Sequence, residues 1–88
     1  MSSDKQFRLQ GEYLRSCREA KGLSQAEAAE ALGIKHQFVS NIERGTASIP
    51  KKRIADVERV LGADHKLLIS AILEDGRRRI VKNLERSK

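Results

Sequence analysis

Residues 24 to 45 read SQAEAAEALGIKHQFVSNIERG, and this stretch decides the fold. Ser24 is a favourable N-terminal cap, and Glu27 stands three residues later, at the spacing of a reciprocal capping box. The alanine-rich run that follows has high helix propensity, and Gly33 stops it because glycine adopts a left-handed conformation at little cost. The pattern predicts a short helix of roughly nine residues, thin enough for a second helix to approach closely.

A second helix is predicted from His36 to Arg44, only two or three residues after the first. Its apolar residues include Val39 and Ile42, which can face the core, and Gly45 ends it. Two short helices joined by a tight, glycine-containing turn form a helix-turn-helix arrangement. The remaining face carries the hydrogen-bonding side chains of His36, Gln37, Ser40, Asn41 and Arg44. Side chains of this kind can read base edges in the major groove, where Gln and Asn pair bidentately with adenine.

The rest of the chain predicts further helices and no strand. The apolar stripes are Phe7, Leu14, Cys17 and Ala20; then Ile54, Val57 and Leu61; then Leu67, Leu68, Ala71 and Ile72. Gly22 and Gly62 are stop signals, whereas Ser48, Pro50 and Asp64 are start signals. The fold class predicted from these patterns is all-α.

Length and composition limit the class of protein. A chain of 88 residues allows one small domain, and a composition of 34% charged and 3% aromatic residues suits short helices packed on aliphatic side chains. The single cysteine, Cys17, excludes an internal disulfide. Neither a membrane-spanning apolar run nor a signal-peptide pattern is present, so we expect a soluble, cytoplasmic protein.

The net charge is +6, and the excess is concentrated near the C-terminus. Residues 74 to 88 hold six basic residues against three acidic ones. An excess of positive charge attracts polyanions such as nucleic acids. A basic surface that only faces solvent is the alternative interpretation.

The sequence resembles the Cro and phage-repressor (XRE-type) family of helix-turn-helix DNA-binding proteins. The matching segments are GLSQAEAAEALGI at residues 22 to 34 and FVSNIERG at residues 38 to 45. The resemblance covers roughly residues 9 to 73 and implies a compact five-helix, lambda-repressor-like domain.

The predicted layout has three parts. A flexible N-terminus occupies residues 1 to 6, and the DNA-binding domain occupies residues 7 to 73. A basic, helical C-terminal extension then follows at residues 74 to 88.

The resemblance also implies roles for residues at matching positions. His36, Gln37 and Asn41 match positions that read bases. The residues expected to contact the DNA backbone or a thymine methyl group are Gln25, Lys35, Phe38, Ser40, Arg44, Lys51 and Lys52. Glu43 resembles a buried carboxylate that pairs with a basic residue of the first helix, here Arg18. For the polar residues the alternative is a side chain that only faces water, and for Phe38 it is packing at the edge of the core.

Two positions depart from the family's pattern. Lys35 stands where a Ser or Thr cap is common, so the recognition helix lacks that cap and Lys35 can instead reach a phosphate. Ala28 stands where a large aliphatic residue is usual, so neighbouring side chains must fill that volume.

The C-terminal extension carries an apolar stripe of its own, formed by Ile69, Leu73, Ile80 and Leu84. Gly76 lies within it and is a candidate break in the helix. A lone helix gains little stability unless its apolar face is covered, so the stripe predicts contact with a second copy of the chain. A solvated basic tail is the alternative.

These features predict a sequence-specific regulator of transcription that binds double-stranded DNA as a homodimer on an inverted-repeat operator. A restriction–modification controller protein, an antitoxin and a phage repressor remain open within this class. A protein-interaction adaptor is a rival, although the polar face of residues 36 to 44 argues against it. An RNA-binding module led by residues 77 to 79 is another, but it lacks interleaved aromatic residues. Neither metal-ligand spacing nor a catalytic arrangement is present, so we expect no enzyme activity, no metal and no cofactor.

Overall fold

The computed structural model describes residues 5 to 86, so most of the predicted flexible N-terminus, residues 1 to 4, and residues 87 and 88 of the predicted extension lie outside the described residues. The elements are α1 (Arg8–Ala20), α2 (Gln25–Leu32), α3 (His36–Glu43), the 3-10 helix η1 (Lys51–Arg53), α4 (Ile54–Leu61) and α5 (His65–Arg86). No strand occurs within residues 5 to 86, which agrees with the predicted all-α, five-helix fold.

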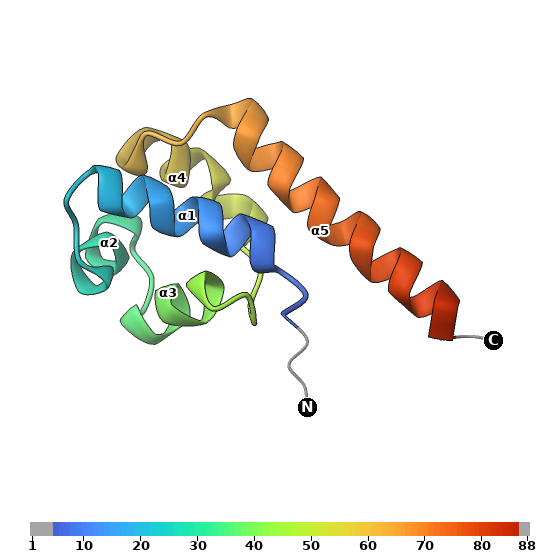
Figure 1. Cartoon of the computed structure of the whole chain (residues 1–88). Helices are drawn as coiled ribbons and strands as arrows, with labels where there is room; N and C mark the ends of the chain where they lie inside the picture. Colours follow the sequence, from blue (N-terminus) through green and yellow to red (C-terminus); the bar gives the residue numbers. More distant parts are fainter. Residues whose placement is uncertain (1–4, 87–88) are drawn as a thin grey trace.

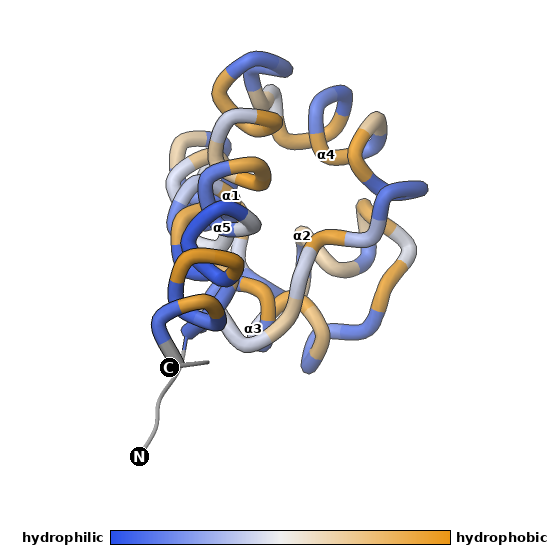
Figure 2. Tube along the Cα trace, turned by 90° about the vertical axis from the view of Figure 1, so that its right-hand side faces the viewer, coloured by the Kyte–Doolittle hydropathy of each residue, from blue (hydrophilic) through white to orange (hydrophobic). Residues whose placement is uncertain are grey.

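The helices enclose one core. Figure 1 shows α1 crossing the middle of the molecule, with α3 below it, α4 above it and α5 running along its flank. Helix α1 contacts α3, α4 and α5, and α2 contacts α3 and α4. The core consists of the buried residues Leu14, Cys17, Ala28, Leu32, Ile42, Ile49, Val57, Leu61, Ala63 and Leu68. Figure 2 shows hydrophobic and hydrophilic residues mixed along each helix, as expected for helices with one buried face.

The predicted signals at the helix ends of the central motif are confirmed. The hydroxyl of Ser24 accepts a hydrogen bond from the backbone N–H of Glu27 (3.0 Å), and the Glu27 carboxylate accepts one from the N–H of Ser24 (2.8 Å). Gly33 ends α2 in the left-handed conformation, with φ 71°. Asp64 caps α5 by accepting from the N–H of Leu67 (3.1 Å). Local hydrogen-bonding chemistry therefore sets these boundaries.

The start of α4 differs from the prediction. Ser48 does not cap it: its hydroxyl donates to Oε1 of Gln10 (3.2 Å), which also accepts from the N–H of Ile49 (2.8 Å). Pro50 precedes η1, and α4 follows without a side-chain cap. The buried side chain of Gln10 therefore accepts the hydrogen bond from the Ser48 hydroxyl and holds the loop after α3 against α1.

The break considered at Gly76 does not occur, because α5 runs unbroken from His65 to Arg86. A glycine inside a helix costs only about 1 kcal/mol relative to alanine. The neighbouring residue offsets this cost: Asp75 is 1% exposed and accepts hydrogen bonds from the backbone N–H groups of Leu9 (3.1 Å) and Gln10 (2.9 Å). These N–H groups belong to the first turn of α1, which has no side-chain cap of its own. A residue of α5 thus supplies the cap that α1 lacks.

Helix α1 meets α3 at Gly11. A Cβ atom at this position would lie 2.1 Å from the carbonyl oxygen of Ile42, a distance that no side chain tolerates. Only glycine allows the two backbones to approach so closely. Gly11 therefore sets the separation of α1 from the helix that carries the predicted base-reading residues.

Candidate nucleic-acid interface

Helix α3 presents one apolar and one polar face. Val39 is fully buried and Ile42 is 1% exposed, whereas His36 and Gln37 are exposed and Asn41 is half-buried. Because apolar residues hold α3 against the core, the three predicted base-reading residues lie off the buried stripe. Figure 1 shows α3 at the lower side of the molecule, opposite α4.

The polar face of α3 is linked by hydrogen bonds along the helix. The amide of Gln37 donates to Oδ1 of Asn41 (3.2 Å), and Arg44 also donates to this oxygen. Arg44 donates in addition to the hydroxyl of Ser40 (2.9 Å). These contacts hold four side chains in one row, so their positions are partly set before any ligand arrives.

A second network fixes the position of α3 against the other helices. The Arg18 guanidinium donates to both carboxylate oxygens of Glu43, from Nε (2.7 Å) and from Nη2 (3.0 Å), in the bidentate geometry that strengthens such pairs. The Glu43 side chain is 4% exposed and that of Arg18 is 11% exposed. The hydrogen bond to Glu43 raises the pKa of Arg18 above its ordinary value. Arg18 also donates to the carbonyl of Leu23 (2.8 Å), so its guanidinium joins α3 to the loop before α2.

Gln25, the first residue of α2, extends this network to the start of α3. Its Nε2 donates to Glu43 (2.9 Å), and its Oε1 lies 3.3 Å from Nε2 of His36. Because the Gln25 amide group donates to Glu43, its carbonyl oxygen is left to accept from His36, which requires the proton on Nε2 of the imidazole. The contact to His36 thus connects a predicted base-reading residue with a buried ion pair.

The remaining predicted backbone-contact residues surround α3. Lys35 precedes the helix, is exposed and makes no side-chain cap, as expected. Lys51 and Lys52 are exposed on η1. Phe38 is half-buried and packs against the core, as in the alternative considered for it, and its contact with DNA stays a prediction. An aromatic side chain gains more from apolar contact than a polar residue at the same edge would.

The predicted dimer residues lie on α5. Leu73, Ile80 and Leu84 are 67%, 62% and 65% exposed, and Ile69 is half-buried. Large apolar side chains that share one helix face and remain exposed form an uncommon surface for a monomer. Helix α5 runs on through residues 73 and 74, so the predicted boundary between domain and extension lies inside one helix.

Two structural residues escaped the sequence patterns. Asp75 and Gln10 are the buried polar side chains that join α5 and the loop after α3 to the start of α1. Each has its partners 38 to 66 residues away along the chain, so no local pattern reveals them.

Other kinds of site receive no support from the geometry. Among residues 5 to 85, no three His, Cys, Asp or Glu side chains come together in a way that could hold a metal ion. The described helices also include none with the length and apolar character needed to cross a membrane.

Comparison with known proteins gives a consistent result. The helix-turn-helix family model (HTH_3) matches residues 14 to 68. Among solved structures, the chain is similar to the clp gene regulator ClgR from Corynebacterium glutamicum, with 30% sequence identity and a TM-score of 0.66. This similarity covers 93% of the present chain and 88% of that one. No curated protein sequence matches the chain.

Proposed function

The chain belongs to the helix-turn-helix family (HTH_3), and from this membership we propose that it regulates transcription by binding an inverted-repeat DNA operator as a homodimer. The observation that carries the proposal is the polar face of α3, where hydrogen-bonding side chains lie off the core on a helix that the Arg18–Glu43 pair joins to α1. The similarity to a gene regulator, ClgR, supports the same class of function.

In this proposal α3 enters the major groove and His36, Gln37 and Asn41 read base edges. Gln37 and Asn41 can each pair bidentately with adenine once they exchange their mutual hydrogen bond for bonds to the base. His36 lies at the first turn of α3, where its Nε2 is turned toward Gln25. Its second ring nitrogen is therefore the atom available to DNA.

Contacts to the phosphate backbone would come from residues on either side of α3. Gln25, Lys35 and Arg44 border the helix, and Ser40 and Phe38 lie on its edge. The exposed ammonium groups of Lys51 and Lys52 extend this border beyond Gly45. Such contacts set affinity and orientation, whereas the bases set sequence preference.

The dimer would form through the exposed apolar stripe of α5. Ile69, Leu73, Ile80 and Leu84 recur at steps of four and seven residues, so they share one face over four turns of the helix. A second copy of the same stripe would cover these side chains and place two recognition helices about one helical turn apart. Two half-sites read in this way make a recognised DNA sequence long enough to be selective.

Selection of bound duplexes from a random DNA pool tests the proposal. The full chain should enrich an inverted repeat whose half-sites are about one helical turn apart. The double variant Gln37→Ala/Asn41→Ala should fold normally and lose this enrichment. Two results would contradict the proposal. One is single-stranded RNA displacing the protein from DNA more effectively than duplex DNA does, and the other is a DNA pool that shows no enrichment.

A further inference from the structure

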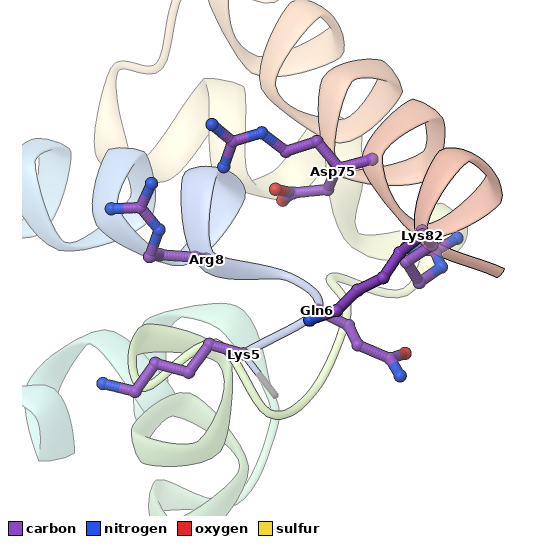
Figure 3. A pocket seen from close by; sticks show the side chains of 7 residues that line it. Lys5, Gln6, Arg8, Asp75 and Lys82 are labelled. Atoms are coloured by element: carbon purple, nitrogen blue, oxygen red, sulfur yellow. The ribbon is translucent and has the colours of Figure 1, made fainter. Parts of the chain in front are cut away.

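A strongly basic pocket of about 490 Å³ lies between the start of α1 and the C-terminal half of α5. Five cationic residues line it, Lys5, Arg8, Arg78, Arg79 and Lys82, around a single carboxylate, Asp75 (Figure 3). None of these cations was among the residues predicted to contact DNA. The pocket therefore needs an explanation apart from the helix-turn-helix itself.

The carboxylate at the base of the pocket is already engaged. Both oxygens of Asp75 accept backbone N–H groups from the first turn of α1. Arg8 and Arg78 lie 3.3 Å and 3.8 Å from acidic side chains outside the pocket, in exposed pairs. Exposed ion pairs contribute little and exchange readily for other partners. The cluster thus keeps a clear excess of positive charge and can attract a further anion.

The pocket adjoins the end of the recognition helix. The carbonyl of Gly45 accepts from the N–H of Phe7 (3.0 Å). A Cβ atom at Gly45 would lie 3.1 Å from the Cα of Arg8 and 3.2 Å from the Cβ of Lys5. The basic cluster therefore begins beside Gly45, which follows α3, and continues onto α5. Figures 1 and 2 both show α3 and the C-terminal end of α5 on the lower side of the molecule.

The basic side chains of α5 lie away from its apolar stripe. Arg78 precedes Ile80 by two residues, and Lys82 precedes Leu84 by two. A step of two residues turns an α-helix by about 200°, so the two sets occupy opposite faces. One face can therefore contact a second subunit while the other contacts an anion.

We propose that this basic cluster binds the phosphate backbone of duplex DNA beyond the base pairs that α3 reads. The inference rests on the proposed function, because it places the cluster on DNA held by α3. Guanidinium and ammonium groups suit phosphate oxygens. The Arg79 guanidinium lies over one face of the Phe7 ring, 4.8 Å from its centroid. Because phosphate contacts carry no base sequence, the proposed contact is sequence-independent and lengthens the footprint of each subunit.

The salt dependence of binding tests this assignment. Binding of the full chain to a mixed-sequence duplex of about thirty base pairs is measured by fluorescence anisotropy over a series of salt concentrations. Arg78→Ala and Lys82→Ala should each reduce the slope of log affinity against log salt by about 1. The loss of affinity relative to wild type should accordingly shrink about fourfold between about 50 and about 200 mM salt.

Arg59→Ala is the matched control, since it removes an exposed arginine that also pairs with an acid but lies on α4 (71% exposed side chain). Its slope should equal that of wild type. The inference would be overturned if Arg78→Ala and Lys82→Ala had the same slope as Arg59→Ala. It would also be overturned if sedimentation showed that the α5 variants bind more weakly because their oligomeric state has changed. Failure of the wild-type chain to bind any duplex would instead refute the proposed function.

Discussion

Replacing Asp75 tests the contact that joins α5 to the rest of the protein. Its carboxylate accepts two hydrogen bonds, from the N–H groups of Leu9 and Gln10, at a position that is 1% exposed. A hydrogen bond to a charged group contributes about 1.5–3 kcal/mol. Asp75→Ala removes both and leaves the first turn of α1 uncapped, so we expect a loss of about 3–5 kcal/mol. That is a large part of the roughly 4–13 kcal/mol typical of a domain of this size.

Asp75→Asn separates the effect of geometry from that of charge. The amide keeps one carbonyl acceptor but loses the second acceptor and the favourable interaction with the positive end of the α1 dipole. We expect about 1.5–3 kcal/mol of destabilisation, between wild type and the alanine variant. Urea denaturation followed by circular dichroism gives the free energy of unfolding of each protein.

Glu74→Ala is the control, because it removes an acid from the adjacent position of α5 that is bonded only to exposed arginines. Its stability should change by less than about 1 kcal/mol. An Asp75→Ala protein as stable as the Glu74→Ala protein would refute the reasoning. In that case the N-terminal N–H groups of α1 would be satisfied equally well by water.

Three further variants test the packing and the assembly. Gly11→Ala should destabilise the fold by about 1–3 kcal/mol, because the added Cβ would collide with the backbone of α3. Alanine favours helix more than glycine does, so a higher midpoint of unfolding in urea would disprove this prediction. Glu43→Ala should cost about 3 kcal/mol by stranding the largely buried Arg18, and a melting temperature equal to that of wild type would show that the pair is dispensable. Ile80→Ser/Leu84→Ser should leave the helical content intact while shifting sedimentation from dimer to monomer, and unchanged sedimentation would exclude the α5 stripe as the interface.

The central motif could be predicted from sequence because its signals are local. A capping box needs residues three positions apart, and a left-handed glycine needs no partner beyond its own helix end. Both therefore leave a short, readable pattern. The pairing of Arg18 with Glu43 is different, since 25 residues separate the two. Only the family resemblance, and no spacing rule, suggested it.

The structure departs from the local signals where a distant contact outweighs a local preference. Gly76 has low helix propensity, yet α5 continues through it because Asp75 is anchored to α1. Ser48 has the chemistry of a cap, yet Gln10 takes its hydroxyl. In both cases the deciding partner lies at least 38 residues away, beyond the reach of any periodicity in the sequence.

The same distant contacts connect the proposed dimer surface on α5 to the recognition helix α3. Asp75 fastens α5 to the first turn of α1, and α1 in turn meets α3 at Gly11 and through the Arg18–Glu43 pair. Every step along this path is a hydrogen bond or a close backbone contact. In a dimer formed through the apolar stripe of α5, the separation of the two recognition helices would therefore depend on how α5 is positioned against α1. A variant such as Asp75→Asn should then relax the half-site spacing that the protein accepts, even where the folded population remains high.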